Sequence, residues 1–163
     1  MSLVSGPIFQ ICWVVEDLEA AEQWFTDTLG VPHWMRVPNV VFGPEHATYR
    51  GEPADFVIDV ALGYFGEQQV ELIRPVSGPS LYTEHLQTSG PGLHHVAWVP
   101  EDFDAALEQA RAQGLTVTQS GTFPGTGMEF AYLDGTAGGA PHVELLRLSP
   151  DMVALFDSVR HPG

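Results

Sequence analysis

The sequence predicts an α+β fold made of two tandem βαβββ modules, and an internal repeat is the main observation behind this prediction. Two short apolar runs, Phe9–Val15 and Gly92–Val99, are each followed within two residues by the pair Glu-Asp, which is typical of a helix start. Two further runs, Val70–Arg74 (VELIR) and Val143–Arg147 (VELLR), are nearly identical. A repeat that agrees at its beginning and at its end indicates duplication of one module.

The first module, about residues 8–76, carries both strand and helix signals. Apolar runs rich in β-branched and aromatic residues predict strands, and apolar residues at helical spacing between Asp17 and Gly30 predict a capped amphipathic helix. Several prolines then favour short strands and loops over helix. The expected elements are a strand over 8–15, a helix over 17–29, short strands and loops over 32–55, and a hairpin of Phe56–Tyr64 with Gln68–Arg74.

A junction over 77–91, with a short helix through Leu81–Leu86, leads into the second module, about residues 92–148. A glycine-rich bend, Gly121–Gly127, separates two of its strands. Ser149-Pro150 is a favourable helix opening, because a capping residue precedes proline at the first helical position. The expected elements are a strand over 93–99, a helix over 102–113, strands over 115–120, 128–133 and 141–148, and a C-terminal helix over about 150–160. We expect residues 1–163 to form a single domain.

The composition excludes several classes of function. A formal net charge of −15 argues against nucleic acid or an anionic membrane surface as a partner. All six basic residues are Arg, so Schiff-base chemistry, a P-loop lysine and pyridoxal phosphate are excluded. The single cysteine, Cys12, cannot form an internal disulfide and suits a reducing compartment. With no signal peptide and no membrane-spanning run, we expect a cytoplasmic protein.

Equivalent strands of the two modules carry polar residues at equivalent positions. Side chains alternate between the faces of a strand, so Gln10 shares a face with Cys12, and His95 shares a face with Ala97. His94 is expected to point the other way. In the closing strand of each module, Glu71 and Glu144 are likewise equivalent. A twofold relation between the modules would therefore bring Gln10, Glu71, His95 and Glu144 to one point.

Taken singly, each of these residues has a simpler interpretation, because a strand Glu usually faces water and a strand His is more often a hydrogen-bonded core residue. Their conjunction in otherwise apolar strands favours a metal site. Burying ionised carboxylates costs several kcal/mol each unless a charge such as a divalent cation compensates. One imidazole, one amide oxygen and two carboxylates suit a borderline or hard divalent ion such as Zn, Ni, Co, Mn or Mg.

The sequence resembles the vicinal oxygen chelate superfamily, which includes glyoxalase I, methylmalonyl-CoA epimerase, extradiol dioxygenases and bleomycin-resistance proteins. The paired modules, the Glu-Asp helix openings, Gly92–Ala97 (GLHHVA) and Val143–Leu146 (VELL) carry the resemblance over nearly the whole chain. The epimerase-like and glyoxalase I-like branches are nearest. The resemblance implies a curved open β-barrel with helices outside, and it places the metal ligands at Gln10, Glu71, His95 and Glu144.

What the resemblance implies is a metal-dependent isomerase, epimerase or lyase that acts next to a carbonyl group of a small-molecule substrate. The metal would chelate vicinal substrate oxygens, and Glu144, or its equivalent Glu71, would be the general base. One alternative is an Fe(II) dioxygenase, whose facial triad requires a second His where Gln10 stands. Another is a non-catalytic, ligand-sequestering protein of the resistance kind, which would not need the ligand set. We also expect a homodimer.

Overall fold

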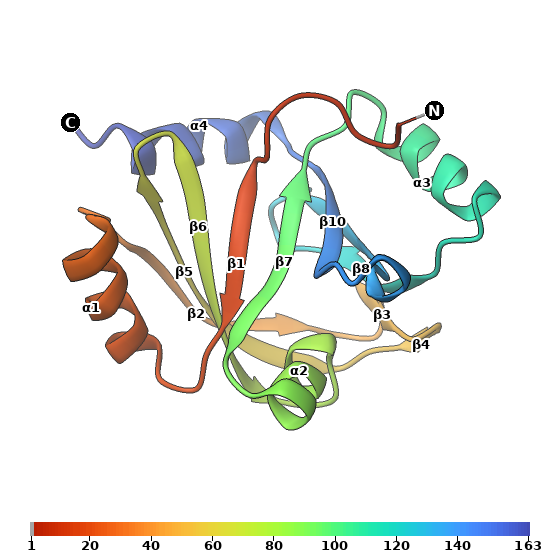
Figure 1. Cartoon of the computed structure of the whole chain (residues 1–163), viewed down its shortest axis with the longest axis horizontal. Coiled ribbons are helices and arrows are strands. Elements are labelled where there is room, and N and C mark those ends of the chain that lie inside the picture. Colours follow the sequence, from red (N-terminus) through yellow and green to blue (C-terminus); the bar gives the residue numbers. More distant parts are fainter. Residues whose placement is uncertain (1) are drawn as a thin grey trace.

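A ten-stranded mixed β-sheet curls into a half-barrel in the computed structural model, which describes residues 2–163 (Figure 1). Within these residues the elements are β1 (Gln10–Val14), α1 (Leu18–Leu29), β2 (Met35–Phe42), β3 (Ala47–Tyr49), β4 (Glu52–Pro53), β5 (Phe56–Phe65), β6 (Gln68–Ser77), α2 (Leu81–Ser89), β7 (Gly92–Trp98), α3 (Phe103–Ala112), β8 (Val117–Thr122), β9 (Glu129–Leu133), a 3₁₀ turn (Thr136–Gly138), β10 (His142–Arg147) and α4 (Pro150–Arg160). The α+β class and the curved open sheet that the sequence predicts are confirmed.

The two halves of the chain join through β1 and β7 in the middle of the sheet, whose strand order is β2-β5-β6-β1-β7-β10-β9-β8-β3-β4. The pairing repeats, because β1 runs parallel to β6 and β7 runs parallel to β10. Even the register repeats: Cys12 lies opposite Glu71 in the first half, and Ala97 lies opposite Glu144 in the second. The modules therefore pair with each other within one chain.

The segment over 32–55 forms β2 and an additional hairpin of β3 and β4. Arg50 and Gly51 both have positive φ, 51° and 83°, as in the two-residue type I′ turn that suits a tight hairpin. This hairpin leaves its own half, because β3 pairs with β8 of the second module. The hairpin accounts for the two strands beyond the βαβββ plan.

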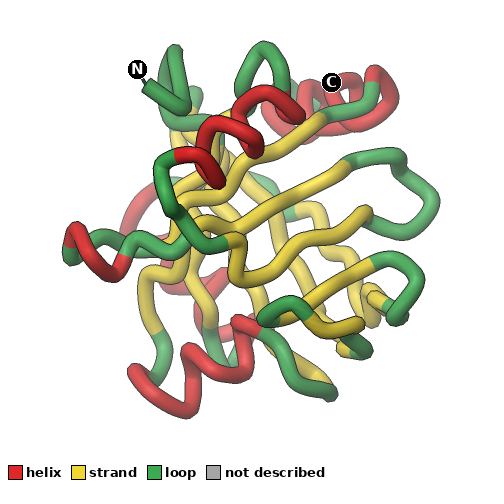
Figure 2. Tube along the Cα trace, turned by 90° about the vertical axis from the view of Figure 1, so that its right-hand side faces the viewer, coloured by secondary structure: helices red, strands yellow, loops and turns green. Residues whose placement is uncertain are grey.

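The helices α1 and α3 start and pack in the same way. Asp17 and Asp102 are the N-caps, and each carboxylate accepts a hydrogen bond from the backbone N–H three residues on. Helix α1 packs its Phe25 against Ala61, Val70 and Leu72, and α3 packs against the outer side of β9 and β10. Figure 1 shows both helices at the periphery of the strands, and Figure 2 shows the curved strands from the side. The concave face of the sheet therefore stays free for the core and the site.

The remaining helices lie at the two ends of the half-barrel, α2 below and α4 above in Figure 1. Both begin at a serine N-cap, Ser80 and Ser149. Helix α2 buries Leu81 and Tyr82 in the main hydrophobic cluster, and α4 contributes Phe156 to the same cluster. Among the described residues, no helix combines the length and the apolar character that crossing a bilayer requires.

A substitution at Gly63 tests how closely the segment that follows α1 packs against the sheet. A Cβ at this position of β5 would lie 2.6 Å from Val31 Cγ1 and 2.8 Å from the carbonyl oxygen of His33. We expect Gly63→Ala to lower the free energy of unfolding by roughly 1–3 kcal/mol, as overpacking does. Gly92→Ala is the matched strand control, because its Cβ would meet no atom within 4 Å. Equal urea midpoints for the two variants would contradict this packing.

Candidate functional site

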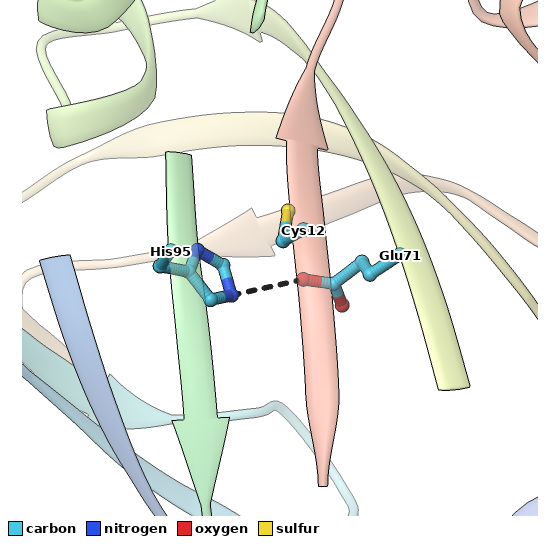
Figure 3. Close-up of side chains that lie close together, drawn as sticks. All are labelled: Cys12, Glu71 and His95. Carbon is cyan, nitrogen blue, oxygen red and sulfur yellow. Dashed lines mark ion pairs between the residues drawn. The ribbon is translucent and has the colours of Figure 1, made fainter. Parts of the chain in front are cut away.

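Four buried side chains converge on the concave face of the sheet. Gln10, Glu71, His95 and Glu144 are 4%, 6%, 0% and 2% exposed, and they come from the adjacent strands β1, β6, β7 and β10. Three oxygens surround one imidazole nitrogen: His95 Nε2 lies 3.0 Å from Glu144 Oε2, 3.3 Å from Gln10 Oε1 and 3.5 Å from Glu71 Oε1. Figure 3 shows Glu71 and His95 pointing toward each other across β1, with Cys12 beside them.

The alternation of the strands explains this convergence. In β6 the neighbours of Glu71, Val70 and Leu72, face outward into the α1 cluster, so Glu71 faces inward. In β10, Leu145 packs against the α3 cluster, and the adjacent Glu144 therefore faces inward as well. The repeat places the two carboxylates on either side of His95. Two acidic side chains thus face one another on the concave side of the sheet.

His94 does not behave as the alternation predicts. The register between β1 and β7 shifts from Cys12 opposite His95 to Trp13 opposite Leu93, so a β-bulge absorbs His94. The expectation that His94 points away from His95 is wrong for this reason. Instead, His94 Nδ1 lies 2.8 Å from His95 Nδ1, and the His94 ring is buried against Tyr82 and Tyr132.

This contact links the tautomer of a neutral His95 ring to that of His94. One of the two Nδ1 atoms donates and the other accepts. If His95 Nδ1 carries the proton, its Nε2 presents a lone pair to three oxygens. If Nε2 carries the proton instead, it can satisfy only one of the three. Glu144 Oε2, although 3.0 Å from Nε2, lacks hydrogen-bond geometry and has no hydrogen-bond partner in the described residues. The donor set therefore fits a bound cation, which would satisfy the oxygens and the Nε2 lone pair together.

The electrostatics of the site point the same way. Burial, together with the nearby charge of Glu144, raises the pKa of Glu71 to about 7, although His95 opposes this rise. Burial also raises the pKa of the Cys12 thiol, and the charges of Glu71 and Glu144 add to the effect. A raised carboxyl pKa is the result expected where two carboxylates are buried together without a compensating charge.

Two residues of the site were missed by the reasoning from sequence. Gln69 accepts a hydrogen bond from Gln10 Nε2 at 2.6 Å and donates one to the Tyr64 hydroxyl at 2.9 Å. These two hydrogen bonds orient the Gln10 amide so that its Oε1 faces His95. The signal for Gln69 was its place two residues before Glu71, on the same face of β6. Cys12 is the second, since ligand atoms of Cys12, Glu71 and His95 all lie within 4.8 Å of one another.

The polar residues form one end of a cavity of about 180 Å³. Gln10, Glu71 and Glu144 line this end. The walls are apolar and come from β2 and β5, with Met35, Val37, Val40, Val60 and Leu62. Helix α4 adds Met152, Leu155 and Phe156. A cavity with apolar walls and a few convergent polar groups is the usual form of a small-molecule site.

Comparison with known protein families gives one match. Residues 9–132, well over half of the chain, match the Glyoxalase/Bleomycin resistance protein/Dioxygenase superfamily. The matched range includes Gln10, Glu71 and His95, and Glu144 lies beyond it. No protein with a curated description matches the sequence significantly.

Solved structures share the fold over nearly the whole chain. A methylmalonyl-CoA epimerase from Mycobacterium tuberculosis has 24% sequence identity and a TM-score of 0.65, and the alignment covers 94% of each chain. A Streptomyces coelicolor methylmalonyl-CoA epimerase variant in complex with 2-nitronate-propionyl-CoA has 19% identity and a TM-score of 0.59, over 91% of this chain and 97% of the other. A hypothetical protein from Bacillus halodurans has 16% identity and a TM-score of 0.64, over 88% and 94%.

The raised pKa of Glu71 predicts how the stability of the metal-free protein depends on pH. The folded state favours protonated Glu71 up to about pH 7, whereas the unfolded chain releases this proton near its ordinary value of 4.5. Protonated Glu71 therefore contributes fully to the free energy of unfolding below pH 4.5. This contribution is lost as the pH rises through 7, and the free energy of unfolding falls by up to about 3 kcal/mol.

Glu71→Gln mimics the protonated side chain and removes this dependence. In EDTA, the urea midpoint of Glu71→Gln should rise relative to that of the wild type as the pH increases from 4.5 to 7. Glu108→Gln, at an exposed position of α3, is the control and should run parallel to wild type. Parallel profiles for all three proteins would contradict the raised pKa.

Proposed function

The chain belongs to the Glyoxalase/Bleomycin resistance protein/Dioxygenase superfamily, and from this premise we propose that it is a metal-dependent isomerase, epimerase or lyase acting next to a carbonyl group. The observation that carries the proposal is the convergence of three side-chain oxygens on His95 Nε2 at the polar end of an apolar cavity. Epimerases among the structures with the same fold support the choice of reaction class.

Gln10, Glu71, His95 and Glu144 would hold the metal ion, because they supply one imidazole nitrogen and three oxygens that face one another. When bound, a divalent cation would act as a Lewis acid toward the carbonyl oxygen of the substrate. His94 holds the His95 ring through its Nδ1, and Gln69 fixes the amide of Gln10. Such contacts behind the ligands orient them and set the tautomer of a ligating His.

Glu144 is the proposed general base. Its side chain lines the cavity, and its buried Oε2 has no hydrogen-bond partner among the described residues, so this carboxylate is the proposed acceptor of a proton from the carbon beside the carbonyl. Glu71 is its equivalent in the other half and lines the same cavity. In the reaction proposed for this protein, removal of that proton would be the first step. The two carboxylates can deliver and take up protons on either side of His95.

The donor set gives less support to the other two functions. An Fe(II) dioxygenase site uses two His and one carboxylate, whereas this site has one imidazole and two carboxylates. A ligand-sequestering protein would bind its ligand through the cavity walls, and it would gain nothing from two buried carboxylates, which cost several kcal/mol without a cation. We further propose a homodimer, with each site built within a single chain.

Metal binding should be visible in thermal stability. Because the ion would bind the folded state alone, Co²⁺ at about 100 times its Kd should raise Tm by roughly 5–10 °C, and EDTA should reverse the shift. His95→Ala should abolish the shift. His46→Ala is the control, because the His46 side chain is 49% exposed and faces Glu45 on a turn. A melting curve of the wild type that is indifferent to EDTA, Co²⁺, Ni²⁺, Zn²⁺ and Mn²⁺ would contradict the metal site.

Replacing the proposed base separates catalysis from metal binding. Glu144→Gln keeps an oxygen donor but cannot accept the proton, so turnover should fall about 10²–10⁴-fold while the Co²⁺ shift persists. The measurement is exchange of the substrate α-proton with D₂O, followed by NMR over a panel of 2-hydroxy ketones and 2-substituted thioesters. Glu71→Gln is the matched variant in the other half of the repeat. If Glu144→Gln exchanges at the wild-type rate and Glu71→Gln does not, the base is Glu71.

A further inference from the structure

We propose that the substrate is a small, uncharged molecule with an apolar body, and that the site discriminates against anionic thioesters of coenzyme A. This inference rests on the proposed function, because the carbonyl end of the molecule has to reach Glu144. It departs from the structural neighbours, since one of them was solved with 2-nitronate-propionyl-CoA and another with methylmalonyl-CoA. The walls of the cavity, the placement of the arginines and helix α4 carry the inference.

The walls of the cavity offer no partner for a negative charge. Apart from the polar end, the lining side chains are aliphatic, thioether or aromatic groups, with Thr126 the one hydroxyl among them. The polar end itself is acidic, since Glu71 and Glu144 line it. A carboxylate on the body of the substrate would lose its hydration without gaining a partner, which costs several kcal/mol. An alkyl or aryl body instead removes apolar surface from water on both sides.

The arginines are all placed away from the cavity. Five of them pair with carboxylates: Arg36 with Glu22, Arg50 with Glu84, Arg74 with Asp59, Arg147 with Asp104 and Glu129, and Arg160 with Glu67. The sixth, Arg111, is exposed on α3, which packs on the outer face of the sheet. The chain has no Lys and a net charge of −15, so the phosphates of coenzyme A would meet a repulsive surface.

Arg36 lies between two cavity residues in the sequence, and its side chain is still turned away from the cavity. It sits between the cavity residues Met35 and Val37 in β2, and its guanidinium binds the buried Glu22 of α1. Because side chains alternate along a strand, Val37 faces the cavity and Arg36 faces the helix. The ion pair with Glu22 keeps this cation outside.

Helix α4 limits the size of the substrate. It lies across one end of the half-barrel in Figure 1 and adds Met152, Leu155 and Phe156 to the cavity wall. The rings of Phe156 and Phe9 pack together with their centroids 5.9 Å apart. Near the end of the helix, Arg160 forms an ion pair with Glu67 in the β5–β6 turn. The cavity volume of about 180 Å³ is below the roughly 300–1,000 Å³ of sites for drug-sized ligands. The cavity therefore suits a small molecule.

Two pairs of probes, each made of an uncharged compound and an anionic counterpart, test the inference on the whole protein loaded with Co²⁺. One pair is the propionyl thioester of N-acetylcysteamine and propionyl-CoA. The other is a hexyl 2-hydroxy ketone and the same ketone with a terminal carboxylate. By isothermal titration calorimetry, the wild type should bind the uncharged member of each pair at least about tenfold more tightly, because only the charged member must bury or approach unpaired negative charge.

An arginine introduced into the wall should reverse this preference. Val37 is 39% exposed and lines the cavity, so Val37→Arg can hold its guanidinium at the mouth and bind the terminal carboxylate. Val41→Arg is the control, because Val41 lies in the same strand, is 54% exposed and does not line the cavity. The control should keep the wild-type preference.

The outcomes separate this inference from the proposed function. Equal or tighter binding of the charged members by the wild type overturns the substrate class, and so does the absence of binding by both uncharged probes. A missing Co²⁺ effect on Tm in the same samples overturns the metal-dependent function instead. A wild-type preference for the uncharged probes that Val37→Arg reverses and Val41→Arg leaves intact supports the inference.

Discussion

The concentration of acceptor oxygens around His95 Nε2 is the constraint on which the rest of this structure depends. Three oxygens, two of them from carboxylates, face one nitrogen, and all four side chains are buried. Like charges buried together are unfavourable in a medium of low polarity, and the raised pKa of Glu71 is the sign of that cost. The surrounding structure has to hold these groups in place against their own repulsion. It does so with strands of a continuous sheet, whose backbone hydrogen bonds fix the face on which each side chain leaves its strand.

Duplication is the means by which the fold brings these groups together. One module supplies an amide and a carboxylate, the other an imidazole and a carboxylate, at equivalent positions of β1 and β6, and of β7 and β10. Helices α1 and α3 both pack on the outer side of the sheet, and the apolar residues next to each carboxylate pack against them there. The carboxylates are then directed to the concave side in both halves. One pattern of alternation therefore builds the helix packing and the polar site at once.

Basic side chains lie outside the cavity, whereas two acidic side chains line it. Five of the six arginines form ion pairs with acidic side chains outside the cavity, and the apolar walls and the acidic end are left without a cation from the protein. A bound metal would therefore be the main positive charge inside the half-barrel. Under that arrangement the metal would select the oxygens of a substrate and the walls would select its body, so the two parts of recognition could be changed independently.

The sequence by itself determined the fold class, the repeat and the identity of four of the residues that meet in the site, Gln10, Glu71, His95 and Glu144. It could do so because strand alternation and helical spacing are local periodicities, and because the repeat relates Gln10 to His95 and Glu71 to Glu144 without any knowledge of distances. The tertiary structure alone decided the bulge that turns His94 onto His95, the bridge from Gln10 to Gln69, the crossing of β3 to β8, and the placement of α4 over the cavity. Each of these depends on register or packing between segments far apart in the chain, which no local pattern of residues encodes.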